Sequence, residues 1–252
     1  GTGQITKAVV TGIINSKLKI SKIFLSERNK RISRILKFKS KKIKIIKNNQ
    51  DIINKSDWVF LAVTPAVGNK ILNDLKFNKN KMIISFISTI NLTQLKKITG
   101  LKSNIVRAIP LPPIALCKGP VPIYPPNSKV KKFFDKLGST VEISNEKLSL
   151  NFWTTSAMMA PFYEILYSLS NWLVKRGIKK ENAQKYISSL FHALSEDAFN
   201  YKKDLKRLVK ESQTPGGLNE QAVKDLRKAG FYRLLEKTSN RIIKRLNKSQ
   251  SN

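Results

Sequence analysis

The first 144 positions alternate between short apolar runs and longer stretches in which apolar residues recur every three or four positions. Residues 58–63 and 82–87 are the clearest apolar runs. Their length and nearly continuous apolar character are typical of strands that are covered on both faces in a parallel sheet. Stretches of helical period separate these runs along the chain. The alternation, with short connecting loops, predicts an open parallel sheet flanked by helices.

The same patterns give approximate bounds for each element. Residues 109–126 contain seven of the ten prolines and predict an extended loop around one short strand. The predicted strands are 20–26, 43–46, 58–63, 82–87, 104–108, 121–124 and an edge strand at 139–142. One helix is predicted to begin after Gly3, with an apolar face formed by Ile5, Val9 and Ile13, and two more are predicted at 30–38 and 130–137. A fourth passes through Val67, Ile71, Leu72 and Leu75. Two further helices are predicted to start at the caps Asn49 and Asn91.

Only helical patterns follow residue 144. They predict helices at 148–175, 181–201, 205–210, 218–228 and 232–246. We therefore predict two domains, an α/β domain at residues 1–144 and an all-helical domain at residues 145–252.

The chain is strongly basic, with 48 Lys and Arg against 16 Asp and Glu and a formal net charge of +32. Such a charge is compatible with a nucleic-acid partner. However, the lysines are spread over every segment, without an arginine-rich arm or interleaved aromatic residues. We favour a solvated basic surface that attracts anionic substrates and keep a nucleic-acid-binding protein as the less favoured alternative.

Cysteine and histidine are too few for several kinds of chemistry. Cys117 and His192 are the only residues of their types, so an internal disulfide, a zinc site and a Ser-His-Asp triad are hard to build. We expect no metal. The chain has no apolar run of membrane-spanning length and no signal-peptide pattern, so we expect a soluble cytoplasmic protein without a membrane partner.

A glycine turn opens the chain, with Gly1 and Gly3 directly before the first helix. Free N–H groups and the positive end of the dipole at such a helix start favour an anion, and glycines let a pyrophosphate approach the backbone. The pattern belongs to the Rossmann-like dinucleotide-binding unit, although Thr6 stands where Gly or Ala is usual. Because that pattern normally follows a buried strand, we expect that the first strand is absent from this chain. An ordinary N-terminus without a ligand stays the alternative.

The end of the predicted strand at 20–26 bears on cofactor choice. NAD-binding units carry an acidic residue about 20 residues beyond the glycines, whereas NADP-binding units supply Arg for the 2′-phosphate. Ser26 and Arg28 favour NADP, while Glu27 keeps NAD possible. Alternatively, Arg28 is one more surface cation.

A second glycine turn lies in the helical half, at residues 214–220. Thr214 followed by a proline predicts a helix cap. The N–H groups of Gly216, Gly217 and Leu218 can form an anion-binding nest suited to a carboxylate. A plain loop between two helices is the alternative.

Several of these landmarks, in this order, resemble the pyrroline-5-carboxylate reductases. The matching segments are residues 1–5, 26–28, 61–65, 84–85, 106–110 and 214–217. The resemblance implies a Rossmann-like parallel sheet domain followed by an all-helical dimerisation domain that interlocks with a partner subunit. It also implies reduction of a cyclic imino acid, 1-pyrroline-5-carboxylate, to proline by a homodimer or higher oligomer. The implied cofactor is NADPH, with NADH as the alternative.

The resemblance also implies roles for individual residues. It implies that Thr214 and Asn219 are catalytic and that Gly216, Gly217 and Leu218 bind the substrate. The residues that it implies bind the cofactor are Gly1, Gly3, Gln4, Ile5, Ser26, Arg28, Ala62, Val63, Thr64 and Pro65.

Departures from the family pattern cluster where the substrate is expected to bind. They fall at residues 110–113, 157–161 and 218–219. A paralogous imine or ketone reductase with another substrate is therefore the close alternative, and a cofactor-binding protein without catalysis is a third. Met158 and Met159 are equally compatible with core packing.

Overall fold

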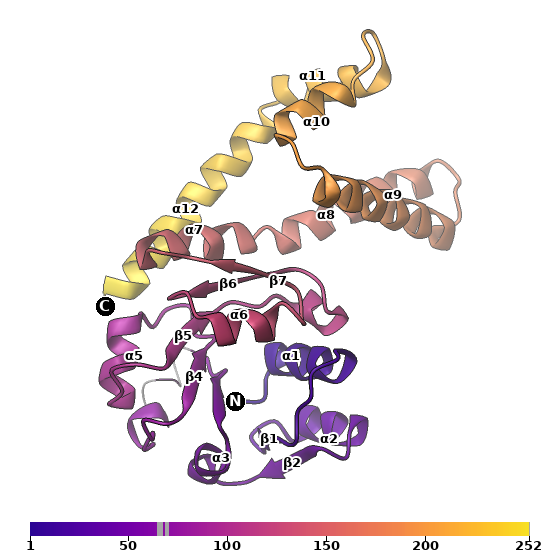
Figure 1. Ribbon diagram of the computed structural model, residues 1–252. Coiled ribbons are helices and arrows are strands. Elements are labelled where there is room, and N and C mark those ends of the chain that lie inside the picture. Colours follow the sequence, from indigo (N-terminus) through magenta and orange to yellow (C-terminus); the bar gives the residue numbers. More distant parts are fainter. Residues whose placement is uncertain (65–67, 69–70, 252) are drawn as a thin grey trace. The chain divides into compact units, whose positions relative to one another are not determined.

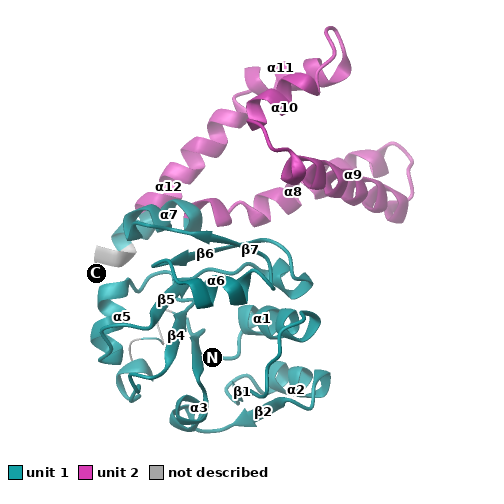
Figure 2. Cartoon of the chain, viewed as in Figure 1, with its two compact units in different colours: residues 1–153, 245–252 teal, residues 154–244 magenta. Residues whose placement is uncertain are grey.

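The computed structural model describes residues 1–64, 68 and 71–251. The chain divides into two compact units (Figures 1 and 2). Residues 1–153 together with 245–252 form unit 1, and residues 154–244 form unit 2. The predicted domain division after residue 144 stays a prediction.

Unit 1 contains two sheets. A two-stranded sheet has the order β1-β2, and a five-stranded sheet has the order β3-β4-β5-β6-β7. Each strand overlaps one of the predicted strands, usually over a shorter range. The bounds are β1 Ile23–Ser26, β2 Ile43–Ile46, β3 Trp58–Leu61, β4 Met82–Ser85, β5 Ile105–Ala108, β6 Pro120–Tyr124 and β7 Ser139–Glu142.

Strand pairing is parallel except between β5 and β6, which are antiparallel. The predicted parallel pairing holds for the other four pairs of strands and fails at this one. A parallel neighbour needs a crossover of a dozen or more residues, usually a helix, between the two strands. The proline-rich connection between β5 and β6 contains only the short 3₁₀ helix η1, Pro112–Leu116, so the chain turns back. The predicted edge position of β7 is confirmed.

Helices cover both faces of the five-stranded sheet. Side chains of α1 and α6 pack with Ile84 and Val106 on one face, while Ile53 of α3 and Leu95 of α5 pack with Ile83 and Ile105 on the other. Successive residues of a strand point to opposite faces, so β4 and β5 are buried on both sides. The bounds of the helices are α1 Gln4–Asn15, α2 Lys30–Lys39, α3 Asn49–Lys55, α5 Leu92–Thr99, α6 Ser128–Phe134 and α7 Glu146–Ser156.

Asparagine side chains fix several helix starts. Asn91 caps α5, as predicted, and also forms a capping box with Gln94. The predicted cap Asn49 was wrong by one position, because the Asn48 side chain accepts the Gln50 N–H at 2.7 Å and Asn49 is already helical. Of the helix predicted through Val67 and Leu75, residues 71–73 are helical, whereas Val67 lies outside the described residues.

Unit 2 is built from helices. The continuous helix predicted at 148–175 was wrong, because α7 ends at Ser156 and a new helix begins at Met159. Pro161 explains the break: a proline ring clashes with the carbonyl four residues earlier and lacks an N–H, but it is tolerated in the first turn of a new helix. The bounds are α8 Met159–Lys175, α9 Lys180–Asn200, α10 Leu205–Glu211, α11 Leu218–Lys228 and α12 Phe231–Ser251, the last of which extends into unit 1.

Many large apolar side chains of unit 2 are exposed, and among its described residues only Thr154, Ser170, Ala183 and Ile187 are buried. Contiguous exposed apolar surface is typical of an interaction site. The exposed residues include Tyr163, Tyr167, Trp172, Tyr186, Leu194 and Phe199.

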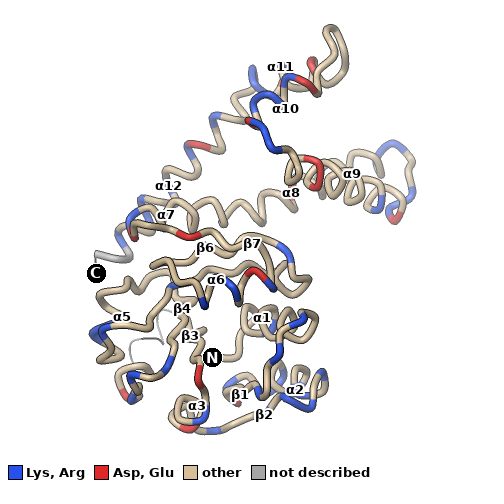
Figure 3. Tube along the Cα trace, in the orientation of Figure 1, with Lys and Arg blue, Asp and Glu red and all other residues tan. Residues whose placement is uncertain are grey.

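The basic residues are spread over the elements of both units (Figure 3), as the sequence predicted. Among the described residues, no helix combines the length and apolar character needed to cross a membrane.

Gly12 provides a test of the packing between α1 and η1. A Cβ at this position would lie 2.3 Å from the Ile114 carbonyl oxygen, which is backbone. We expect Gly12→Ala to reduce the free energy of unfolding by about 1–2 kcal/mol, since overpacking outweighs the gain in helix propensity. Chemical denaturation measures the change. Gly3→Ala is the control, because it adds the same methyl group where no other atom lies within 4 Å; an equal loss in both variants would contradict the explanation.

Candidate functional site

A large cavity in unit 1 lies between the two sheets. It has a volume of about 1090 Å³ and is lined by every residue of β1 and of β3. Side chains of α1, α3 and α6 also contribute to its lining. Ligands in open α/β sheets bind at the carboxyl ends of strands, so the predicted cofactor residues are expected at that end.

Five of the predicted cofactor residues line this cavity. They are Gly1, Ser26, Arg28, Ala62 and Val63. The others lie close by in the chain but are not part of the lining: Gly3 is the N-cap of α1, Gln4 and Ile5 are its first two residues, and Thr64 is exposed directly after Val63. Pro65 lies outside the described residues.

The turn that enters α1 is held between the carboxyl ends of β1 and β3. On one side, a Cβ on Gly1 would lie 2.2 Å from the Ala62 carbonyl oxygen, so only glycine fits without a shift of the backbone. On the other side, the Thr2 hydroxyl donates a hydrogen bond to the Ser26 carbonyl at 2.6 Å. Thr2 is a contact that the sequence analysis did not identify.

Thr6 stabilises the turn instead of crowding it. Its hydroxyl donates to the Gly1 carbonyl at 2.8 Å, so the branched side chain in the third position of the glycine pattern ties the helix to the turn. The first N–H groups of a helix have no carbonyl partner within it. The first turn of α1 contains no acidic residue, so these donors and the helix dipole suit an anion such as a pyrophosphate.

Burial and the charge of Arg28 both act on the amino group of the turn. The pKa of the Gly1 amino group is lowered to about 6, first by the protein atoms around it and second by the positive charge of Arg28. Arg28 is exposed at the cavity, and its backbone N–H lies 3.5 Å from the Ser26 hydroxyl.

Three lysines that the sequence analysis missed also line the cavity, namely Lys129, Lys132 and Lys136. Lys129 and Lys132 lie three residues apart in α6 and so share one face of that helix, and Lys136 follows the helix end. That spacing was the available signal. In a chain with 48 basic residues, that signal did not stand out.

The second predicted turn, in unit 2, differs from the prediction. Thr214 is not the helix cap: α11 begins at Leu218 with Gly217 as N-cap. The Gly217 N–H donates to the Thr214 carbonyl at 2.8 Å, which closes the turn. The Asn219 side-chain amide donates to the Ser212 carbonyl at 3.0 Å.

A carboxylate already binds within this second turn. The Gly216 N–H donates to the Glu220 carboxylate at 2.8 Å, and the Lys224 ammonium lies 2.9 Å from its other oxygen. Both contacts lower the pKa of Glu220, with Lys224 as the larger cause. The predicted nest thus has the chemistry to bind a carboxylate, although Glu220 occupies the Gly216 donor in this structure.

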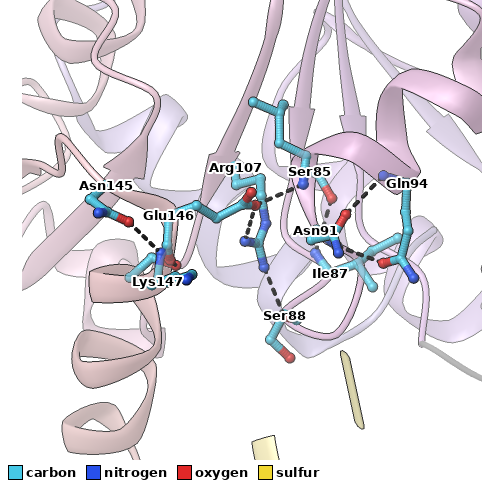
Figure 4. A network of polar contacts seen from close by, with 11 residues as sticks. Ser85, Ile87, Ser88, Asn91, Gln94, Arg107, Asn145, Glu146 and Lys147 are labelled. Atoms are coloured by element: carbon cyan, nitrogen blue, oxygen red, sulfur yellow. Dashed lines mark hydrogen bonds and ion pairs between the residues drawn. The ribbon is translucent and has the colours of Figure 1, made fainter. Parts of the chain in front are cut away.

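A buried ion pair lies at the carboxyl ends of β4 and β5 (Figure 4). The guanidinium of Arg107, whose side chain is 1% exposed, contacts the Glu146 carboxylate at 2.6 Å and donates to the Ser88 carbonyl at 2.8 Å. It also lies over the Trp153 ring at 5.2 Å. Burial lowers the pKa of Arg107, and the charge of Glu146 opposes that shift.

Glu146 connects this pair to a helix start. The same carboxylate oxygen accepts the Leu92 N–H, the first of α5, at 2.7 Å. The start of α7 is therefore attached to the sheet and to α5 within unit 1. The sequence analysis placed Arg107 in a strand but did not pair it with Glu146, which lies 39 residues away. The signal that could have indicated a buried ion pair was a charged residue within an apolar strand.

Comparisons with known proteins cover nearly the whole chain. A family model described as "NADP oxidoreductase coenzyme F420-dependent" matches residues 1–89, and one described as "Pyrroline-5-carboxylate reductase dimerisation" matches residues 147–249. Pyrroline-5-carboxylate reductase from Staphylococcus aureus (strain COL) is 23% identical in an alignment of 257 positions that covers 97% of this chain and 94% of that protein.

Solved structures show the same fold. Plasmodium falciparum pyrroline carboxylate reductase, with NADP bound, has a TM-score of 0.83 at 22% identity and covers 99% of this chain and 96% of its own. A pyrroline-5-carboxylate reductase from Coxiella burnetii has a TM-score of 0.84 at 21% identity, with the same coverage.

The Rossmann-like sheet domain, the helical unit and the two family models define an NAD(P)-dependent oxidoreductase with a C-terminal dimerisation domain. Within that class, the chain belongs to the pyrroline-5-carboxylate reductase family. The resemblance stated from the sequence and the predicted fold class are thereby confirmed.

The buried ion pair generates a stability prediction. We expect Glu146→Gln to lower the free energy of unfolding by about 2 kcal/mol, because it leaves the buried Arg107 charge without its counterion. Glu142→Gln removes the same charge from an exposed side chain at the end of β7 and should change stability by less than about 0.5 kcal/mol. Urea denaturation measures the free energy of unfolding of both variants. Similar losses in the two would show that the ion pair contributes little to stability.

Proposed function

We propose that this protein reduces the C=N bond of 1-pyrroline-5-carboxylate to give proline, with NADPH as the hydride donor. The observation that carries the proposal is the glycine turn held between the ends of β1 and β3, in a chain that matches the family over nearly its full length. The proposed reaction belongs to proline biosynthesis, and a cytoplasmic location is part of the proposal. The single free thiol of Cys117 is compatible with that location.

The residues at the cavity fit a dinucleotide. The start of α1, with Gly1, Gly3, Gln4 and Ile5, would bind the pyrophosphate through backbone N–H groups. The positive charge of Arg28 near the turn and the absence of an acidic side chain in the first turn of α1 support this assignment.

Arg28 and Ser26 favour NADPH over NADH. Both line the cavity beside the end of β1, where a Rossmann-like unit binds the adenosine ribose. An exposed guanidinium can form charge-assisted hydrogen bonds with a 2′-phosphate. Ala62, Val63, Thr64 and Pro65 follow β3 and would line the cofactor farther along the sheet.

The second glycine turn would bind the substrate carboxylate. We assign binding to Gly216, Gly217 and Leu218, and positioning of the reacting imine to Thr214 and Asn219. Support comes from Glu220, whose carboxylate accepts the Gly216 N–H. A substrate carboxylate would displace Glu220, which can keep its ion pair with Lys224.

The reaction needs little acid–base chemistry from the protein. The nicotinamide supplies the hydride, which adds to the imine carbon, and the nitrogen takes one proton, so that a C=N bond becomes C–H and N–H. A cyclic imine can enter already protonated. The side chains named above therefore bind and orient the two reactants and exclude water.

The proposed active form is a homodimer or higher oligomer assembled through the C-terminal helices. The apolar side chains that unit 2 exposes on α8 and α9 would be covered in such an assembly. The family model that matches residues 147–249 carries dimerisation in its name.

The substrate assignment is tested by NADPH oxidation with the purified chain. We expect 1-pyrroline-5-carboxylate to have the highest kcat/KM in a panel that also contains piperideine carboxylates, cyclic imines without a carboxylate, and ketones. The carboxylate nest predicts that uncharged imines are poor substrates. A higher kcat/KM for an uncharged imine or a ketone would identify the alternative, a paralogous reductase with another substrate.

The cofactor assignment is tested by Arg28→Ala. We expect NADPH affinity to fall about tenfold or more, since hydrogen bonds to charged groups contribute about 1.5–3 kcal/mol, while NADH affinity changes little. Fluorescence titration with both cofactors measures the two constants. Arg31→Ala is the matched control, because it removes the same charge from an exposed position that does not line the cavity. Equal losses of affinity for NADPH and NADH would show that Arg28 does not bind the 2′-phosphate.

A further inference from the structure

Val63, which follows β3 and lines the cavity, is supported by the connection between β4 and α5, residues 86–91. It packs against the apolar cluster that contains Ile87 and Ile90, both of which are buried. A Cβ added at Gly68 would lie 3.5 or 3.6 Å from side-chain atoms of all three residues. The two isoleucines and Val63 therefore meet around one position, and the place of Val63 depends on where the connection lies.

The buried ion pair holds this connection at two points. The two terminal nitrogens of the Arg107 guanidinium have different partners, because one contacts the Glu146 carboxylate at 2.6 Å and the other donates to the Ser88 carbonyl at 2.8 Å. The same Glu146 oxygen accepts the Leu92 N–H at 2.7 Å. Figure 4 shows the guanidinium between Glu146 and Ser88. The pair thus restrains both the middle of the connection and the residue at which it enters α5.

The two isoleucines lie within the restrained stretch. Ile87 directly precedes Ser88, and Ile90 comes two residues before Leu92. Hydrogen bonds to charged groups are roughly twice as strong as those between neutral groups, so these two backbone groups are held firmly. Protein interiors are close-packed and transmit small displacements. A shift of the backbone at Ser88 or Leu92 would consequently move the side chains on which Val63 packs.

Stability alone does not account for a charge at this position. Apolar residues of similar volume in place of a buried ion pair are often neutral or stabilising, whereas loss of one partner is costly. Apolar side chains, however, cannot bind a carbonyl and an N–H at the same time. The planar fork of Arg107 presents several donors in fixed directions, and Glu146 supplies the acceptor. The arrangement is suited to fixing a backbone segment in one place.

We propose that Arg107 and Glu146 are positioning residues for the cofactor, which act through Ile87 and Ile90 on Val63. Neither of the two charged residues has to touch the cofactor. Their effect is to keep the segment after β3 at the edge of the cavity. The inference rests on the proposed function, in which residues 62–65 line the cofactor.

The two cofactors give this role a distinct signature. Residues 62–65 are assigned to a part of the dinucleotide that NADPH and NADH share, whereas Arg28 is assigned to the 2′-phosphate, which only NADPH carries. Loss of positioning should therefore weaken the binding of both cofactors by the same factor. Loss of Arg28 should weaken NADPH binding selectively.

The test measures the Kd of NADPH and of NADH by fluorescence titration for the unchanged chain, Glu146→Gln and Ile43→Ala. Circular dichroism selects a temperature at which all three are folded. Glu146→Gln keeps the size of the side chain but removes the charge that holds Arg107. Ile43→Ala is the control, because it removes a buried side chain from the start of β2, in a separate apolar cluster and outside the cavity lining. It should destabilise the fold at least as much.

We expect Glu146→Gln to raise the Kd of both cofactors by about threefold or more, and by the same factor for each. Ile43→Ala should leave both values nearly unchanged. Three outcomes would overturn the proposal: an unchanged Kd in folded Glu146→Gln, an equal rise in Ile43→Ala, or a rise for NADPH only.

Arg107→Lys decides the question if Glu146→Gln does not fold. The lysine keeps a positive charge opposite Glu146, but it offers one nitrogen where arginine has two and cannot hold the carboxylate and the Ser88 carbonyl in the same geometry. The same loss of affinity for both cofactors is expected. Unchanged affinity for both would show that the fork does not position the segment after β3.

Amide hydrogen exchange at Gly68 separates this inference from the proposed function, because it needs no cofactor. The Gly68 N–H donates to the Thr64 carbonyl at 2.9 Å and so reports on the segment after β3. We expect Glu146→Gln to speed exchange there by about threefold or more, with a clearly smaller change in Ile43→Ala. A chain that binds neither cofactor would contradict the proposed function only. Unchanged exchange at Gly68 would overturn the positioning role whether or not the cofactor binds.

Discussion

The contact of Gly1 with the Ala62 carbonyl is the constraint on which the candidate site depends. It places the backbone against the end of β3, while Thr2 attaches the same turn to the end of β1. The start of α1 is consequently fixed over the carboxyl ends of both strands, where its N–H groups are available to an anion. A side chain at Gly1 would separate the turn from β3 and move the helix start away from the residues that follow that strand.

The two units use their apolar residues differently. Unit 1 gathers many of its apolar residues into three clusters, two on the faces of the five-stranded sheet and one against the two-stranded sheet. Unit 2 exposes many of its large apolar side chains and buries few of its described residues. This contrast has one physical explanation: a layered sheet can cover its own faces, whereas a few amphipathic helices with one buried stripe need further surface to cover the rest. The name of the family model that matches residues 147–249 agrees with this explanation.

Charge plays two separate roles. The large excess of Lys and Arg is distributed over both units, while Arg107 is fully buried and pairs with Glu146. A charge spread of this kind attracts anionic reactants at long range without selecting one. Selection depends on a few positions, such as Arg28 beside the cavity and Glu220 in the second turn.

Local pattern determined the order of helices and strands, the change from an α/β to a helical region and the glycine turn, because apolar periodicity, asparagine caps and glycine act over a few residues. Tertiary structure alone decided the antiparallel pair β5–β6, the use of Gly216 by Glu220, and the pairing of Arg107 with Glu146. The two glycine turns belong to different units, and only the fold shows which side chains contact each turn. Such partners lie from four to tens of residues apart, and a composition rich in Lys gives no sign of which charge meets which carboxylate until the chain has folded.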